Sequence, residues 1–145
     1  MSRMSRAFFI STATAVLLAA CAAQTPADAY ALTDLVADLE AAGVEAPEAG
    51  SIEQDFFSTT GRRFNFDGQE VQVFEYADEA ARQTESELIQ PDGSPNPTTM
   101  VTWIDQPNFW ARGRLIVLYV GRQAATIERL SSALGQPLTE PWPGG

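Results

Sequence analysis

The spacing of apolar residues along the chain predicts both helices and strands. Apolar side chains recur every three or four positions in three segments, each of which is typical of a helix with one buried face. These segments are residues 31–42, 77–90 and 124–134. Shorter runs that alternate, or that are rich in β-branched and aromatic residues, predict strands. The predicted strands are residues 63–66, 69–76, 99–105 and 114–120, with 55–59 as a further candidate. The stretches 44–54 and 106–113 are predicted to be irregular connections.

The pair Asp67-Gly68 lies between two of these strands. Both positions of the tightest hairpin turns need a positive φ, which aspartate tolerates and glycine adopts freely, so the pair predicts a hairpin. The strand over residues 114–120 is apolar on both of its faces, which is typical of a strand at the centre of a sheet. In the helix over residues 77–90, we expect Ala81, Thr84 and Leu88 to face inward.

The order of these elements is helix, two or three strands, helix, two strands, helix. It predicts an α+β fold: an antiparallel sheet of four to five strands with about three helices packed on one face, as a two-layer sandwich. Residues 31–138 are expected to form this single domain, and residues 139–145, rich in proline and glycine, to form a flexible tail.

The amino terminus has a different pattern. Arg3 and Arg6 precede 14 residues without charge, a length that suits the apolar core of a signal peptide and is short for a membrane span. This run ends in Leu-Ala-Ala-Cys at residues 18–21, which resembles the lipobox of bacterial lipoproteins. The resemblance implies a diacylglyceryl group on the Cys21 sulfur, followed by cleavage between Ala20 and Cys21. Residues 1–20 would then be the signal peptide, and residues 21–30 the lipidated cysteine and a short tether.

This interpretation places the chain in the cell envelope, anchored to a membrane through Cys21 and facing the periplasm or the exterior. Two or more acyl chains hold a protein firmly on a bilayer, whereas one chain holds it marginally. The alternative is an ordinary secretory signal, which would leave Cys21 with a free thiol.

Composition narrows the possible chemistry. The chain has 19 acidic residues, 9 arginines, one cysteine, no lysine and no histidine. Removal of Arg3 and Arg6 leaves 7 positive against 19 negative side chains, a balance of −12. Binding of nucleic acid through a basic patch is therefore not expected. The absence of histidine excludes a Ser-His-Asp triad and a histidine zinc site. We expect no cofactor and no metal.

Two groups of residues are candidates for contact with a ligand or partner. Exposed aromatic side chains at Trp103, Phe109 and Trp110 could stack on a sugar, an apolar ligand or a protein. The alternative that we favour is that they cover the edge of the core. Arg112 and Arg114 would share one strand face and could attract an anion, but pairing with the many carboxylates is the favoured alternative.

Carboxylates are numerous but not spaced in an informative way. Asn65, Asp67 and Glu70 surround the Asp-Gly turn and could hold calcium loosely, although they lack the ligand number of an EF-hand loop. Glu53 with Asp55, or Glu85 with Glu87, could be imagined as the acid pair of a glycosidase, without any sequence feature that would bring either pair across a cleft.

Several segments together resemble a family of small uncharacterised bacterial lipoproteins. They are VQVFEY (71–76), PDG (91–93), VTW (101–103), FW (109–110), GRLIVLYVG (113–121) and LG (134–135). The resemblance covers most of the chain after Cys21 and implies export, but it carries no activity. We therefore expect a non-enzymatic binding or accessory module of the envelope, acting on an unknown envelope protein or ligand. The alternative is an envelope hydrolase that uses carboxylates and arginines.

Overall fold

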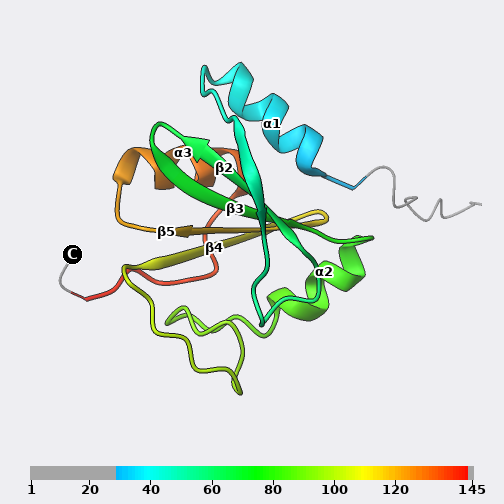
Figure 1. Ribbon diagram of the computed structural model, residues 1–145, viewed down its shortest axis with the longest axis vertical. Helices are drawn as coiled ribbons and strands as arrows, with labels where there is room; N and C mark the ends of the chain where they lie inside the picture. The colour runs from blue at the N-terminus through cyan, green and yellow to red at the C-terminus, as the bar shows by residue number, and fades with distance from the viewer. Residues whose placement is uncertain (1–28, 144–145) are drawn as a thin grey trace, which may run out of the picture.

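The computed structural model describes residues 29–143, which contain one antiparallel sheet and three helices (Figure 1). The predicted signal peptide and Cys21 lie outside the described residues. The elements in chain order are α1 Leu32–Ala41, β1 Glu48–Ile52, β2 Gly61–Phe66, β3 Gln69–Glu75, α2 Glu79–Ser86, β4 Pro107–Arg112, β5 Leu115–Val120 and α3 Ala124–Leu134. The strand order is β1-β2-β3-β5-β4, and every neighbouring pair is antiparallel. The predicted α+β class and antiparallel sheet are confirmed.

The β2–β3 hairpin forms where the sequence predicts it. Asp67 has a φ of 50° and Gly68 a φ of 83°, as the turn requires. The Asn65 side chain accepts a hydrogen bond from the Gly68 backbone N–H at 2.8 Å, which ties the turn to the strand before it. Phe66 pairs with Gln69 to close the hairpin.

The central strand is β5, which pairs with β3 on one side and with β4 on the other. Its residues from Leu115 to Tyr119 are at most 1 % exposed. Leu115, Val117 and Tyr119 face one side of the sheet, and Ile116 and Leu118 face the other. The sheet is therefore buried on both faces, as the apolar run of β5 indicates.

The two faces are covered differently. In Figure 1, α1 and α3 lie above the sheet, while α2 and the long connection before β4 lie below it. The helical side buries Phe64, Phe66, Val71, Val73 and Trp110 against leucines of α1 and α3. The opposite side buries Phe74, Tyr76 and Phe109 against Phe57 and Ile89, which come from segments outside the strands and helices. A layer of helices thus accounts for one face, and mostly non-helical chain covers the other.

The two edge regions differ from the sequence prediction. Residues 44–54, expected to be irregular, contain β1, whose sequence Glu-Ala-Gly-Ser-Ile is exposed up to the half-buried Ile52 and so gives no apolar alternation. Residues 55–59 form turns that insert Phe57 into the core, and residues 99–105 form no strand. Residues 55–59 contain two adjacent aromatic residues, and residues 99–105 contain alternating apolar residues. Both patterns are typical of strands, but here they belong to loops whose side chains reach the core.

β4 occupies residues that were expected to form a connection. It begins at Pro107, and Asn108 follows, both of which are typical of loops. β4 is an edge strand with β5 as its one strand partner. Proline, which has no backbone N–H to donate, is tolerated on an edge strand but not in the middle of a sheet. The Asn108 amide donates to the carbonyls of Tyr119 at 3.1 Å and Gly121 at 2.9 Å, which permits its burial.

Helix α2 turns a different face inward from the one expected. Ala81, Thr84 and Leu88 are exposed. The inward side instead carries Ser86, which is buried, and Arg82, whose Nε donates to the Gly113 carbonyl at 2.8 Å. This helix therefore docks through hydrogen bonds more than through apolar contact, which a search for apolar spacing does not detect.

The expected tail lies against the edge of β4. The Leu138 N–H donates to the Phe109 carbonyl at 2.7 Å, and the Thr139 hydroxyl accepts from the Phe109 N–H at 3.2 Å. Thr139 is buried, and the Trp142 N–H donates to Gln106 at 3.1 Å. The folded unit thus extends through Trp142, because the open edge of β4 offers hydrogen-bonding groups to the chain end.

Ile116→Ala tests the central strand. Ile116 is fully buried, so we expect a loss of about 3 kcal/mol in the free energy of unfolding, measured by chemical denaturation. Ile104→Ala is the matched control, because Ile104 is 97 % exposed and its loss should change stability by at most about 0.5 kcal/mol. Equal effects of the two substitutions would contradict the two-sided burial of β5.

Candidate functional site

Two of the three candidate aromatic residues are not available to a ligand. Phe109 and Trp110 are adjacent on β4, point to opposite faces of the sheet and are each 0 % exposed. The Trp110 indole N–H donates to the Ser131 hydroxyl of α3 at 3.2 Å, so its polar atom is also satisfied. Both side chains belong to the core, as the favoured alternative predicts, and the candidate role in contact with a ligand or partner is wrong for Phe109 and Trp110.

Trp103 is different, because it is only partly buried and lies on the connection before β4. Its ring makes edge-to-face contacts with Phe109 at 5.9 Å and with Phe56 at 6.0 Å between centroids. Its indole N–H donates to the Gly93 carbonyl at 3.0 Å. These contacts fix the orientation of a side chain that still reaches the surface.

Trp103 lines an open groove of about 450 Å³ on the side of the sheet away from α1 and α3. This volume is within the range of small-molecule sites, roughly 300–1,000 Å³. Its lining comes from the connection before β4, from β3, from the end of β5 and from Gln54, which follows β1. Its lining residues are Gln54, Glu70, Gln72, Val101, Thr102, Trp103, Ile104 and Val120. We call this hollow the Trp103 groove.

The polar side of the Trp103 groove is a row of linked planar groups. The Gln54 amide donates to the Gln72 carbonyl oxygen at 2.9 Å, and the Gln72 amide donates to Glu70 at 3.2 Å. The other oxygen of Glu70 lies 3.7 Å from Arg63. Gln72 and Glu70 stand on alternate positions of β3, which places them side by side on one face of that strand.

The structure places Arg112 and Arg114 in contacts that hold the domain together. The Arg112 guanidinium lies 3.7 Å from the centre of the Tyr30 ring and 3.7 Å from Asp38, and it donates to the Ala133 carbonyl. The Arg114 guanidinium donates to Glu75 at 2.6 Å. The same Glu75 oxygen accepts from the N–H of Leu32, at the start of α1, at 3.2 Å. These arginines therefore hold Tyr30 and helix α1 against the sheet.

All seven arginines of the described residues are engaged in this way. Each one has a carboxylate within ion-pairing distance. The pairs are Arg62–Glu48, Arg63–Glu70, Arg82–Glu79, Arg112–Asp38, Arg114–Glu75, Arg122–Asp105 and Arg129–Asp67. The favoured alternative of intramolecular pairing is what the structure contains, and it gives no support to an anion site at Arg112 and Arg114.

The residues around the Asp-Gly turn have other partners as well. Asn65 holds the turn, Asp67 pairs with Arg129 of α3, and Glu70 belongs to the Trp103 groove. Within residues 29–143, no group of three or more cysteine, histidine, aspartate or glutamate side chains is placed to hold a metal ion.

The hydrolase alternative needs two carboxyl groups facing each other across a cleft. Glu85 and Glu87 are drawn apart: Glu85 accepts from the Tyr76 hydroxyl at 2.6 Å and from the Ser58 N–H, whereas Glu87 is exposed. One surface hollow does have both Asp92 and Glu140 in its lining. Hydrogen bonds from the Ser94 backbone and hydroxyl lower the pKa of Asp92, which is the opposite of what a general acid needs.

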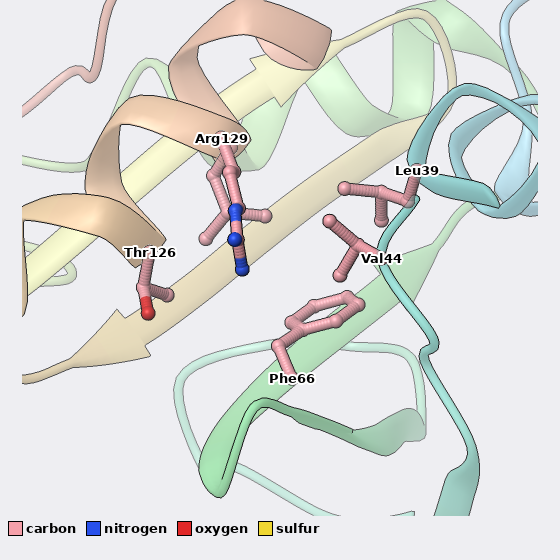
Figure 2. A pocket seen from close by; sticks show the side chains of 6 residues that line it. Leu39, Val44, Phe66, Thr126 and Arg129 are labelled. Atoms are coloured by element: carbon pink, nitrogen blue, oxygen red, sulfur yellow. The ribbon is translucent and has the colours of Figure 1, made fainter. Parts of the chain in front are cut away.

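Two further hollows are weaker candidates for a binding site than the Trp103 groove. A cavity of about 10 Å³ lies between α1, β2 and α3, lined by Leu39, Val44, Phe66, Thr126, Arg129 and Leu130 (Figure 2). It has room for about one water molecule, so it is a packing gap. A groove of about 460 Å³ near Arg122 and Trp142 lies between α3, the start of β4 and the terminal segment that covers β4.

Comparisons with models of protein families, with curated proteins and with solved structures find no match for this chain. No helix within residues 29–143 has the length and apolar character to cross a bilayer. The function of this chain is therefore inferred from its own sequence and structure.

The groove is only partly foreseen by the sequence. Trp103 is a candidate from sequence alone, but Gln54 and Gln72 are not, since isolated glutamines are typical of any solvated surface. The only signal in the sequence is the period of β3, which puts Glu70 and Gln72 on one face opposite the buried valines. Gln54 joins them only through the fold.

Arg114→Gln tests the structural role of the arginines. Because Arg114 and Glu75 are partly buried and join α1 to the sheet, we expect a loss of about 1 to 2 kcal/mol in the free energy of unfolding. Arg62→Gln is the matched control: its pair with Glu48 is about half exposed, and its loss should cost at most about 0.5 kcal/mol. Denaturant titration of both variants measures the difference, and an unchanged stability of Arg114→Gln would refute this role.

Tyr76 predicts how stability changes at alkaline pH. Burial, followed by the hydrogen bond to Glu85, raises the pKa of Tyr76. The unfolded chain therefore loses this proton at about pH 10 while the folded chain keeps it, so the contribution of Tyr76 to stability is constant below that pH and falls above it. Comparison of chemical denaturation at about pH 8 and about pH 11 should show a smaller decline in Tyr76→Phe than in the unmodified chain. Equal declines would show that Tyr76 titrates alike in both states.

Proposed function

We propose that this chain is an exported lipoprotein, anchored to a membrane through Cys21, whose folded domain is a non-enzymatic binding module of the cell envelope. The observation that carries the anchor is the sequence at residues 18–21, Leu-Ala-Ala-Cys, at the end of an uncharged run of 14 residues behind Arg3 and Arg6. The positive charges, the length of the uncharged run and the four-residue motif all indicate a lipoprotein signal peptide.

The position of the folded domain supports the anchor. The first helix begins at Leu32, and Tyr30 is already held by Arg112, so the domain starts soon after Cys21. Nine chain steps separate Cys21 from Tyr30 and span at most about 30 Å when fully extended. A lipid on Cys21 would therefore keep the domain close to the bilayer.

The charge of the domain indicates that the domain itself does not bind the membrane surface. All arginines of the described residues are paired, and the chain after Cys21 has a balance of −12. Such a body is repelled by anionic headgroups, and a polybasic segment that would bind them is missing. Attachment then depends on the lipid, and the domain stays available to ligands or partners.

The Trp103 groove supports binding in preference to catalysis. It offers a fixed aromatic ring and amide groups, which are recognition elements. Glu70 is the one carboxylate in its lining, so the groove lacks the second acid that a hydrolase of the glycosidase type requires. The envelope hydrolase therefore has less support than a binding or accessory module.

Cys21→Ser tests the anchor. In cells given an alkyne analogue of palmitate, the unmodified chain should take up label and have the mass of a chain that begins at Cys21 with acyl groups. The variant should take up no label and keep the mass of the uncleaved precursor, because the resemblance implies that cleavage follows acylation.

Mass and label decide this experiment, since an uncleaved signal peptide can itself hold the variant in the membrane. Ala22→Ser is the control, because it makes the neighbouring position a serine and leaves the thiol in place. An unmodified chain that carries no acyl group, or a Cys21→Ser variant that is cleaved normally, would exclude the lipoprotein assignment.

A further inference from the structure

We infer that the Trp103 groove binds a neutral saccharide. This inference deepens the proposed binding function by naming the class of ligand. It rests on the lining of the groove, where Trp103 and aliphatic side chains meet the uncharged polar groups of Gln54, Gln72 and Thr102, and where the single carboxylate, Glu70, is paired with Arg63. A pyranose ring has the same two characters, because its C–H bonds form apolar patches and its hydroxyl groups surround them.

The apolar side of the groove suits the C–H patches of a sugar ring. Trp103 is held by the Gly93 carbonyl and by two edge-to-face aromatic contacts, so little side-chain entropy is lost when a ligand packs against it. Val101 and Val120 also line the groove, as does Ile104, which is 97 % exposed. A side chain so exposed gains burial only when something occupies the groove.

The polar side suits hydroxyl groups. Gln54 and Gln72 each use one amide N–H within the row, and each amide group carries a second N–H. Their carbonyl oxygens have two lone pairs each, and Thr102 adds a hydroxyl. The row therefore presents both donors and acceptors, as pairs of neighbouring sugar hydroxyls require.

The charges around the groove disfavour the other classes of small ligand. An anion would meet Glu70 and the acidic body of the protein. A cation would have to compete with Arg63, which lies 3.7 Å from Glu70. A purely apolar ligand would cover the amides of Gln54 and Gln72 without pairing them, at a cost of about 1 to 3 kcal/mol for each unsatisfied group.

The test uses the mature chain purified in a zwitterionic detergent, because detergents with sugar headgroups would occupy the same groove. Saturation-transfer difference NMR with cellotriose, maltotriose and N,N′,N″-triacetylchitotriose detects binding of the ligand itself. We expect at least one of these neutral trisaccharides to bind with a dissociation constant of about 1 mM or lower. Trigalacturonate, a matched trisaccharide with three carboxylates, should bind at least about tenfold more weakly.

Substitution locates the binding. Gln72→Leu should weaken the neutral saccharide by about fivefold or more, because the leucine leaves the hydroxyl groups without partners. Gln83→Leu makes the same change on the exposed side of α2, outside the groove, and should leave affinity unchanged. Thermal unfolding of both variants confirms that each is folded, and Trp103→Phe then tests the aromatic side.

Three outcomes would overturn the inference: no saturation transfer from any neutral trisaccharide at about 10 mM, equal binding of trigalacturonate, or equal affinity of the Gln72→Leu and Gln83→Leu variants. The test is independent of acylation. Binding by a chain that proves to lack lipid would leave the saccharide inference standing and remove only the anchor.

Discussion

The burial of β5 on both faces is the constraint on which the rest of the structure depends. A strand that is apolar all round has to be covered on two sides, and three short helices are too few to cover both. α1 and α3 cover one face. The other face is covered by α2, by turns and by the long connection before β4 (Figure 1), and Phe57, Ile89 and Trp103 pack against it. The site that we consider functional is a consequence of this second, mostly non-helical cover.

The alternation of β4 explains why adjacent aromatic residues have separate roles. Phe109 and Trp110 face opposite sides of a sheet that is buried on both, so neither can reach solvent. Trp103 lies on a connection, where the backbone is not forced into alternation, and it rests on Phe109 with part of its ring at the surface. Phe109 thus supports Trp103, which is the one of the three candidate aromatic residues that still reaches the surface.

The arginines explain the electrostatic character of the molecule. Each arginine of residues 29–143 pairs with a carboxylate, and several of these pairs join elements that are distant in sequence, such as Arg129 with Asp67 and Arg114 with Glu75. Positive charge is therefore used within the fold, and the surplus of carboxylates gives the surface its acidic character. A neutral ligand is the kind that such a surface neither attracts nor repels, so contact geometry in the groove has to supply its affinity.

The sequence by itself determined the elements with strong local signals. These are α1 and α3, the hairpin at Asp67-Gly68 and the central strand β5, because periodicity and turn chemistry act within a few residues. The lipobox prediction likewise depends on local pattern alone. Only the tertiary structure decided β1, β4 and the docked terminal segment, since these exposed or edge segments are held by hydrogen bonds to distant chain. It also decided the groove, where Gln54 meets Gln72 across a loop and a strand, because such a contact depends on how the chain returns to itself and not on any spacing along it.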